Sequence, residues 1–353
     1  MGSPPKPTRW PAILVARMLG AIALSWVLLR WRLARRPAPL CVVACFDSLG
    51  DNLLINSLIA QAFERCGRLH IVVSPHPRIY RRTPGVFSVL SPRLRIVGLA
   101  RLLGIKAYKP VYEEGAVDTD RHVRPEGNIM DALASRMDLP PPIRREPLWT
   151  VPRGPVAPRV GMPRVAIMSG GHGARHPMLN KEWGSHNFQR CIDLLKKECH
   201  FIHLGAKEDA PLDGVEDHRG ANVFTELPNL LASCDLFVGQ VGFLMHLARA
   251  LNVPSVIVYG GRERAWQSGY PSNINLESDV ECSPCWYHNR CEYDRKCLKL
   301  ITPEEVGTKI QEYLGARTET MGRRISIPVP DNGRTENGTR KTSHGTQNLA
   351  PRT

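Results

Sequence analysis

The sequence lacks acidic residues at its amino end. Residues 1–36 carry seven Lys or Arg and no Asp or Glu, so this segment alone supplies +7 of the formal net charge of +14. Residues 316–353 carry seven basic and three acidic residues, a further +4. Only +3 is left for the middle of the chain. That is an ordinary surface charge, and it argues against a basic groove for nucleic acid in the folded core.

The chain also has little that is typical of a disordered or disulfide-stapled protein. Its 353 residues include 10 Cys and are 42% hydrophobic, which suffices for the cores of two domains. The apolar stretch at residues 13–29 is shorter than the roughly 20 residues that cross a bilayer. Arginines follow it, where a secretory signal would have the small residues of a cleavage site.

We expect residues 1–36 to associate with an anionic membrane surface. Trp10, Trp26 and Trp31 flank or end the apolar stretch, as rings that prefer the membrane interface do. A tilted span with its Arg-rich end in the cytoplasm and a helix in the plane of the surface are both open, and Arg17 favours the second. The alternative is a further helix packed on the domain that follows.

Residues 234–261 predict a strand, a glycine turn, a helix and a second strand. Residues 235–238 and 254–259 are short apolar runs, and residues 243–251 between them have the apolar density of a buried helix. Two parallel strands with a crossover helix fit this order. The turn at residues 239–242 then lies at the carboxyl edge of the sheet, beside a helix N-terminus, where anions bind.

The same succession of strand, turn and helix is expected on both sides of a proline-rich linker. Further strands are expected at residues 40–46, 69–73, 87–90, 94–97, 164–168 and 200–204. Further helices are expected at residues 52–67, 186–198, 225–233 and 303–314. Asp51 starts the first of these helices. It either caps that helix or presents a carboxylate at the sheet edge as a general base.

Four motifs follow one another along the chain: Gly50-Asp51, Asn180-Lys181-Glu182-Trp183, Met245-His246-Leu247-Ala248 and the cysteine-rich segment 282–306. In this order they resemble glycosyltransferase family 9, whose best-known members are the lipopolysaccharide heptosyltransferases. The resemblance covers roughly residues 40–314. It implies an α/β chain of GT-B architecture, with two Rossmann-like domains facing across a cleft, to which this chain adds the N-terminal hydrophobic helix.

Five segments follow from this resemblance and from the composition. They are a membrane-associating helix at 1–36, an acceptor domain at 37–150, a linker at 151–163, a nucleotide-sugar domain with the cysteine cluster at 164–315, and a disordered tail at 316–353.

The resemblance implies an inverting glycosyltransferase. It would move a sugar, heptose or another, from a nucleotide-sugar donor to a lipopolysaccharide-type or other lipid-linked glycan. It would need no cofactor for catalysis and would act at the cytoplasmic face of the inner membrane of a bacterium. A non-catalytic relative that binds a nucleotide sugar or a glycan is the alternative.

The resemblance also implies roles for single residues. Asp51 matches the family's base for the acceptor hydroxyl, and Lys181 matches the lysine that offsets diphosphate charge. The donor-binding residues implied are Ser169, Gly170, Lys181, Glu208, Gly242, Met245 and His246. Asp209 is an alternative to Glu208. A buried structural histidine is the alternative for His246.

One acidic residue of the family's pattern is missing. Many members carry Asp-Ser-Gly or Asp-Thr-Gly just before the helix histidine, where this chain has Val241, Gly242 and Phe243. In heptosyltransferases that aspartate helps to hold the donor sugar. The absence of this aspartate fits a donor whose sugar is not heptose, or an inactive relative.

The cysteine cluster has the spacing of a metal site. Cys282, Cys285, Cys291 and Cys297 lie within one short segment, and four thiolates of that spacing can close on a structural zinc. Free thiols and disulfides are the alternatives. A reducing cytoplasm disfavours the disulfides.

Overall fold

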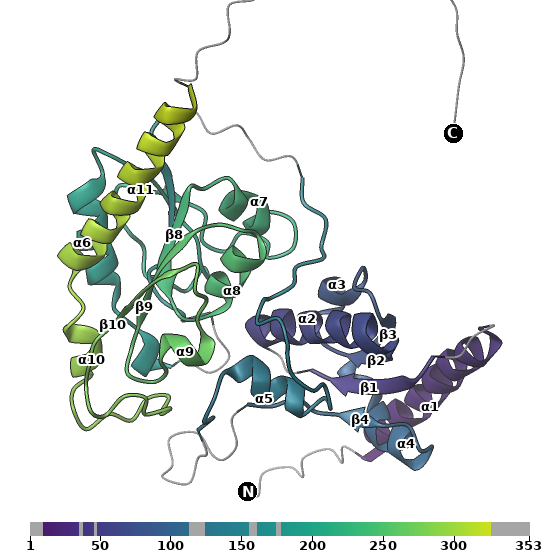
Figure 1. Cartoon of the computed structure of the whole chain (residues 1–353). Coiled ribbons are helices and arrows are strands. Elements are labelled where there is room, and N and C mark those ends of the chain that lie inside the picture. The colour runs from purple at the N-terminus through teal and green to yellow at the C-terminus, as the bar shows by residue number, and fades with distance from the viewer. Residues whose placement is uncertain are drawn as a thin grey trace, which may run out of the picture. The chain divides into compact units, whose positions relative to one another are not determined.

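The structure, a computed structural model, describes residues 10–34, 38–45, 48–112, 124–154, 161–173 and 178–325. The described residues up to Glu312 form one compact unit, which contains two parallel β-sheets (Figure 1). Each sheet has helices packed on it, so the predicted α/β class with two Rossmann-like halves is confirmed.

The first sheet lies in the amino-terminal half and has the strand order β3-β2-β1-β4, with every neighbouring pair parallel. Its strands are β1 (Leu40–Ala44), β2 (Leu69–Val73), β3 (Val86–Leu90) and β4 (Ala107–Tyr108). The helices of this half are α1 (Trp10–Leu33), α2 (Leu49–Cys66), α3 (Pro77–Tyr80), the 3₁₀ turn η1 (Pro92–Leu94), α4 (Ile96–Leu102) and α5 (Ile129–Ser135).

The second sheet has the order β10-β9-β8-β5-β6-β7 and is also parallel throughout. Its strands are β5 (Arg164–Ile167), β6 (His200–His203), β7 (Glu216–Asp217), β8 (Leu236–Gln240), β9 (Ser255–Tyr259) and β10 (Ile274–Glu277). Its helices are η2 (Leu179–Lys181), α6 (Ser185–Leu195), α7 (Leu227–Ala232), α8 (Phe243–Ala250), α9 (Ala265–Ser268), α10 (Lys296–Lys299) and α11 (Pro303–Ile325).

Two sequence-based predictions of secondary structure are wrong. Residues 94–97 were expected to form a strand, but η1 ends at Leu94 and α4 begins at Ile96. Ile96 and Ala100, four residues apart, both turn to the core, which is a helical spacing. At the carboxyl end, α11 continues to Ile325, past the expected start of a disordered tail. Residues 326–353 of that tail, and 155–160 of the linker, lie outside the described residues.

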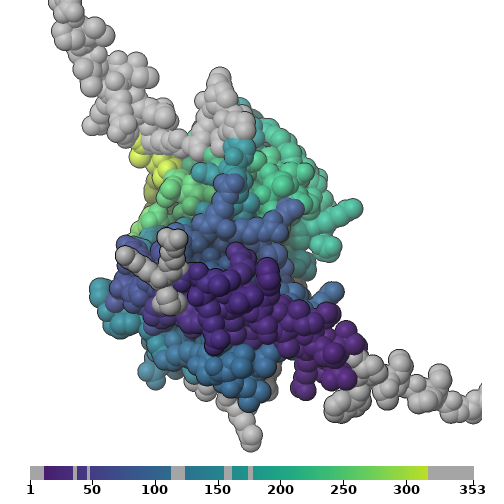
Figure 2. Space-filling model, turned by 90° about the vertical axis from the view of Figure 1, so that its right-hand side faces the viewer, coloured from purple at the N-terminus to yellow at the C-terminus, as the bar shows by residue number. Residues whose placement is uncertain are grey.

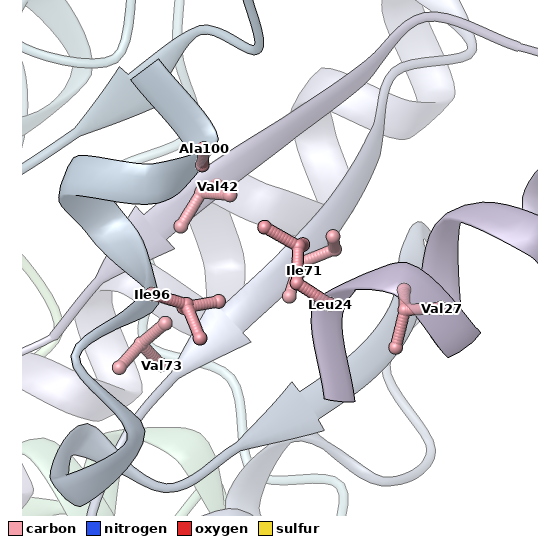
Figure 3. Packing of buried hydrophobic residues seen from close by; sticks show 7 residues of the cluster. All are labelled: Leu24, Val27, Val42, Ile71, Val73, Ile96 and Ala100. Carbon is pink, nitrogen blue, oxygen red and sulfur yellow. The ribbon is translucent and has the colours of Figure 1, made fainter. Parts of the chain in front are cut away.

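Helix α1 is part of the first domain's core. Leu24 and Val27 are 0% and 4% exposed and pack in one cluster with residues of β1, β2 and α4 (Figure 3). That cluster consists of Leu24, Val27, Val42, Ile71, Val73, Ile96 and Ala100. At Gly20 an added Cβ would lie 2.0 Å from the carbonyl oxygen of Leu94, so only glycine permits this close approach. The first helix therefore packs on the domain that follows it, and its association with a membrane stays a prediction.

We predict that α1 contributes directly to the stability of the domain. Leu24→Ala removes a fully buried side chain and should lower the free energy of unfolding by about 2–5 kcal/mol. The matched control is Leu19→Ala, because Leu19 is 53% exposed on the same helix and its loss should change stability little. Urea denaturation of the full chain measures both. Equal effects of the two substitutions would contradict the observed packing.

Candidate active site

Asp51 lies in the first turn of α2, directly after β1. Ser48 caps this helix, since its hydroxyl oxygen accepts a hydrogen bond from the backbone N–H of Asp51 at 3.4 Å. The expectation that Asp51 itself is the cap is therefore wrong. Its carboxylate is available for another role, at the end of the sheet where ligands of parallel α/β folds bind.

The start of α2 touches the start of α8 in the second half of the chain. An added Cβ at Gly50 would lie 3.0 Å from Cδ2 of His246 and 3.7 Å from Cα of Phe243. A side chain at position 50 would push the two helices apart. The lack of a side chain at Gly50 thus lets Asp51 approach residues of the second sheet's domain. This close approach gives a physical reason for the glycine in the Gly50-Asp51 motif.

Lys181 meets a carboxylate that the sequence did not single out. Its ammonium contacts Oε1 of Glu263, and Nη1 of Arg262 reaches the same oxygen at 3.1 Å. Glu263 and Arg262 are almost fully buried, whereas 18% of the Lys181 side chain stays exposed. A ligand in the site can therefore reach the lysine but not the carboxylate behind it.

Asp51 belongs to the same electrostatic cluster. Burial raises the pKa of Asp51 to about 6, and a hydrogen bond from Tyr112 and the charge of Lys181 partly offset this. For Glu263, burial acts to raise the pKa, but the charges of Lys181 and Arg262 outweigh it and hold the pKa at about 2. The cluster therefore keeps one carboxylate ionised at all ordinary pH values, while Asp51 titrates near neutrality.

His246 stands on α8 beside this cluster. Its Nδ1 lies 2.5 Å from the hydroxyl of Tyr270, and burial lowers the pKa of His246 to about 4. The imidazole is therefore neutral at pH 7. Nε2, the other ring nitrogen, lies on the side of the ring that faces Gly50. The ring therefore has a structural partner in Tyr270, and its contact with a donor stays a prediction.

The glycine loop after β5 is held by side chains from elsewhere in the same domain. The hydroxyl of Ser169 donates to the Ala210 carbonyl at 2.6 Å and lies 3.0 Å from Nε2 of His203. Ser169 is 1% exposed. Its hydroxyl hydrogen is thus used inside the domain, and the predicted hydrogen bond from this hydroxyl to phosphate is not what the geometry favours. An added Cβ at Gly170, the next residue, would lie only 3.2 Å from the carboxylate of Glu182, so the loop packs closely against that side chain.

Asp209 and Glu208 at the end of β6 have different surroundings. Asp209 is buried and accepts hydrogen bonds from the backbone N–H groups of His172 and Ala206, at 2.7 and 2.8 Å. It ties the two loops together. Glu208 is exposed beside it. Of the two carboxylates weighed for the ribose, Glu208 is the one that a ligand can reach.

Gly242 and Met245 lie at the start of α8, and only the first of them lies beside open space. An added Cβ at Gly242 would meet nothing within 4 Å, so there is open space beside this turn. Met245 is fully buried, and its sulfur accepts a hydrogen bond from the hydroxyl of Tyr259 at 3.4 Å. Met245 therefore supports α8 from the core, and in this conformation it cannot touch a donor as predicted.

The four clustered cysteines are free thiols. Cys297 is buried, and Cys282, Cys285 and Cys291 are half-buried. Among the described residues, no three His, Cys, Asp or Glu side chains are grouped closely enough to hold a metal ion. The zinc expected at these cysteines stays a prediction.

The cysteine loop, residues 282–297, hydrogen-bonds to the two chain segments that carry Lys181 and Glu263. Sγ of Cys297 accepts a hydrogen bond from the N–H of Gly261 at 3.0 Å, and the N–H of Trp286 donates to the carbonyl of Arg262 at 2.8 Å. On the other side, the Asn180 side chain donates to the carbonyls of Tyr287 and Arg290 at 3.1 and 2.8 Å. The loop therefore fixes Lys181 and Glu263 against each other.

Four residues around the site were not predicted from the sequence: Arg262, Glu263, Tyr112 and Tyr270. A signal existed for the first two, because they follow Gly260-Gly261 at the carboxyl end of β9, the strand next to β8. Ligand-contacting residues gather at this edge of a parallel sheet. Tyr112 and Tyr270 lie in loops, and nothing in their local sequence marks them.

Comparison with known proteins supports the reading of the second half. Residues 162–294 match the family model of glycosyltransferase family 9 (heptosyltransferase). The predicted resemblance is thus confirmed for this segment. A search of curated protein sequences found no match.

Solved structures of similar fold cover most of the chain. The iron-containing dodecameric glycosyltransferase TibC of enterotoxigenic E. coli has a TM-score of 0.61 at 16% identity, over 80% of this chain and 78% of its own. The ADP-heptose lipopolysaccharide heptosyltransferase II of E. coli gives 0.54 at 15% identity, over 79% and 99%. A family 9 glycosyl transferase of Veillonella parvula gives 0.53 at 12%, over 78% and 97%. The predicted GT-B architecture is confirmed by these likenesses.

We predict that ionisation of Asp51 costs stability. Its folded pKa of about 6 lies above the value of 3.8 for an unburied aspartate, so its stabilising contribution is complete below pH 4 and is lost as the pH rises through 6. Relative to wild type, Asp51→Asn should therefore gain about 1–2 kcal/mol between pH 4 and pH 8, allowing for the partial exposure of the group. Urea denaturation at both pH values measures this gain. A difference that does not change with pH would contradict the buried, destabilised carboxylate.

Proposed function

We propose that this chain, whose second domain is a glycosyltransferase family 9 domain, is an inverting glycosyltransferase that uses a nucleotide sugar. The observation that carries the proposal is that Asp51 of the first sheet's domain and Lys181 and His246 of the second come together in one partly buried cluster. A site shared by two domains suits a reaction that joins two substrates.

Asp51 is the general base in this proposal. A base works best when its pKa lies near the working pH, because it is then mostly ionised and still accepts a proton readily. Burial gives Asp51 a pKa of about 6, which meets that condition at pH 7. It would take the proton of the acceptor hydroxyl as that oxygen attacks the anomeric carbon, and attack opposite the leaving diphosphate inverts that carbon.

Lys181 and the start of α8 receive the leaving diphosphate. The exposed part of Lys181 brings a positive charge to the site, and the open space beside Gly242 lies at the positive end of a helix. The neutral imidazole of His246 can donate one further hydrogen bond. These groups offset the charge that develops on the leaving group, so we expect catalysis without a bound metal ion.

ADP-heptose is the first donor to test. The TibC structure with ADP-D-β-D-heptose shows that a protein of this fold binds that nucleotide sugar. Glu208, exposed at the end of β6, is placed to accept hydrogen bonds from the ribose. Val241 stands where many relatives have an aspartate, so a donor that carries a sugar other than heptose is an equal alternative. The iron named for TibC adds iron to zinc as a metal for the four cysteines.

The acceptor that we propose is a lipopolysaccharide-type or other lipid-linked glycan, reached at the cytoplasmic face of the inner membrane of a bacterium. Support comes from α1, which is long and apolar enough to cross a membrane, with only 17% of its most apolar stretch buried. Its inner face, with Leu24 and Val27, is packed in the domain core. Lipid cannot surround such a helix, so we favour a helix lying in the membrane plane.

The outer face of α1 fits this arrangement. It runs lengthwise across the molecular surface (Figure 2), and its large apolar side chains are about half to three-quarters exposed. They are Leu14, Val15, Met18, Leu19, Ile22, Trp26, Leu29 and Leu33. On the neighbouring α4 segment Leu102 is 85% exposed. Residues 10–34 and 91–107 contain several arginines and no acidic residue, as an anionic lipid surface requires.

A non-catalytic protein that binds a nucleotide sugar is the second candidate. The buried Val241 favours it, because an acid of the family's pattern is absent there. The presence of Asp51, Lys181 and His246 in one cluster favours an enzyme. Turnover of a bound donor separates the two.

We predict selective binding of one nucleoside diphosphate. Calorimetric titration of the full chain with ADP, UDP, GDP and CDP should find one that binds, and Lys181→Ala should weaken that binding by about tenfold or more, because a charge-assisted contact to phosphate is lost. The matched control is Lys196→Ala, an exposed lysine of the same domain. Binding of none of the four, or equal binding by Lys181→Ala, would contradict the proposed donor site.

We predict that the full chain binds vesicles of phosphatidylcholine with phosphatidylglycerol more tightly than vesicles of phosphatidylcholine alone. Ile22→Gln/Leu29→Gln should weaken binding to the anionic vesicles by about tenfold or more, because two apolar side chains no longer enter the bilayer. The control is Leu194→Gln/Leu300→Gln, at two exposed leucines of the other domain. Vesicle sedimentation measures the binding, and equal loss in both variants would contradict a docking face on α1. Deleting the helix is a poorer test, since deletion also opens the core around Leu24.

A further inference from the structure

The acid that the family's pattern places at the end of β8 is missing from this chain. Position 241 is a valine that is 6% exposed, and Gly242 and Phe243 follow it. The neighbouring Gln240 accepts a hydrogen bond from the N–H of Trp183 at 3.2 Å, so the end of β8 lies close to the segment that carries Lys181. The structure thus has a lysine near this strand end but no carboxylate on the strand itself.

A carboxylate comes instead from the next strand of the sheet. β9 is hydrogen-bonded to β8, and Glu263 lies in the loop that follows β9. Its Oε1 contacts the ammonium of Lys181 and accepts a hydrogen bond from Arg262. Two cations therefore hold one buried carboxylate in a single position.

The loop that carries Glu263 is itself fixed. An added Cβ at Gly260 would lie 2.3 Å from the carbonyl oxygen of Asn180, so the two segments touch through their backbones. Arg262 lies over the ring of Trp286 at 4.6 Å and reaches Nε2 of His288 at 3.1 Å. With so many contacts, the carboxylate is set in place before any ligand arrives.

One contact to Glu263 leaves Lys181 able to act on a ligand. An ammonium has three hydrogen atoms to donate, so two are left for phosphate oxygens when one is given to the carboxylate. A lysine side chain that is held in this way loses less conformational freedom when a ligand binds than one that is free in solvent.

We propose that Glu263 is the positioning residue that fixes Lys181 toward the diphosphate of the donor. The proposal rests on the proposed function for its ligand. It concerns a residue outside the four motifs that carry the family resemblance in the sequence.

The ion pair is tested first without any ligand. In the full chain, acylation of lysine amines by an N-hydroxysuccinimide ester at pH 8 is followed residue by residue by mass spectrometry. Glu263→Gln should raise the labelling rate of Lys181 at least fivefold, and Glu263→Asp should raise it less. The rates at Lys196 and Lys299 should not change. An unchanged rate at Lys181 in a folded Glu263→Gln variant would overturn the proposal, whatever the protein binds.

The need for a carboxylate at position 263 is tested by comparing Glu263→Asp with Glu263→Gln. Equal labelling rates of Lys181 in these two folded variants would overturn the proposal.

The role toward the ligand is tested with the nucleoside diphosphate that wild type binds. Its affinity should fall about tenfold in Glu263→Gln, and Glu263→Gln should have no further effect in a Lys181→Ala background. A purely structural role would instead lower affinity equally in both backgrounds, and that result would overturn the proposal. If wild type binds none of the four diphosphates, the proposed function fails, while the labelling result still decides whether Glu263 anchors Lys181.

Discussion

The site depends on one buried carboxylate between two cations. Glu263 takes both Lys181 and Arg262 on the same oxygen, in surroundings where each charge alone would be costly. Removing Glu263 would leave the two cations beside each other without their shared counter-charge. The cluster therefore fixes the lysine at the sheet edge, and through Lys181 and Glu263 it also acts on the ionisation of Asp51, which the first domain contributes. Charged residues of the second domain therefore influence the ionisation of the carboxylate in the first.

The cysteine loop gives this cluster its support. It hydrogen-bonds to the chain around Asn180 on one side and around Gly261 on the other, so the spacing of Lys181 and Glu263 follows from the fold of the loop. That gives the four cysteines a structural reason to lie beside the site. A metal ion bound by these thiols would further restrict the movement of the loop that supports Lys181 and Glu263. The packing of α1 is a separate matter, since it completes the first domain and leaves an apolar, acid-free outer face.

Much of the fold followed from local patterns. Strand, turn and helix from residue 234 to 261 were predicted almost to the residue, because buried parallel strands and glycine turns have strong local signals. The error at residues 94–97 arose because a short apolar run fits a strand or a helix equally well. Ser169 and Met245 were expected to bind the donor, but their roles depend on partners distant in sequence, Ala210 and Tyr259. The same distance hid Glu263 from the sequence, since its contact with Lys181 joins two loops that only the folded sheet brings together.

The most direct test of the account is donor turnover by wild type and by Asp51→Asn. The full chain is incubated with ADP-heptose and other nucleotide sugars in the presence of inner-membrane lipid extract, and the released nucleoside diphosphate and the glycosylated lipid are measured. We expect wild type to release diphosphate and form product, and Asp51→Asn to bind the donor equally but to turn it over about 10²- to 10⁴-fold more slowly. Equal turnover by the two proteins would contradict the role of Asp51. A donor that binds but is never turned over would contradict the enzyme and leave a binding protein.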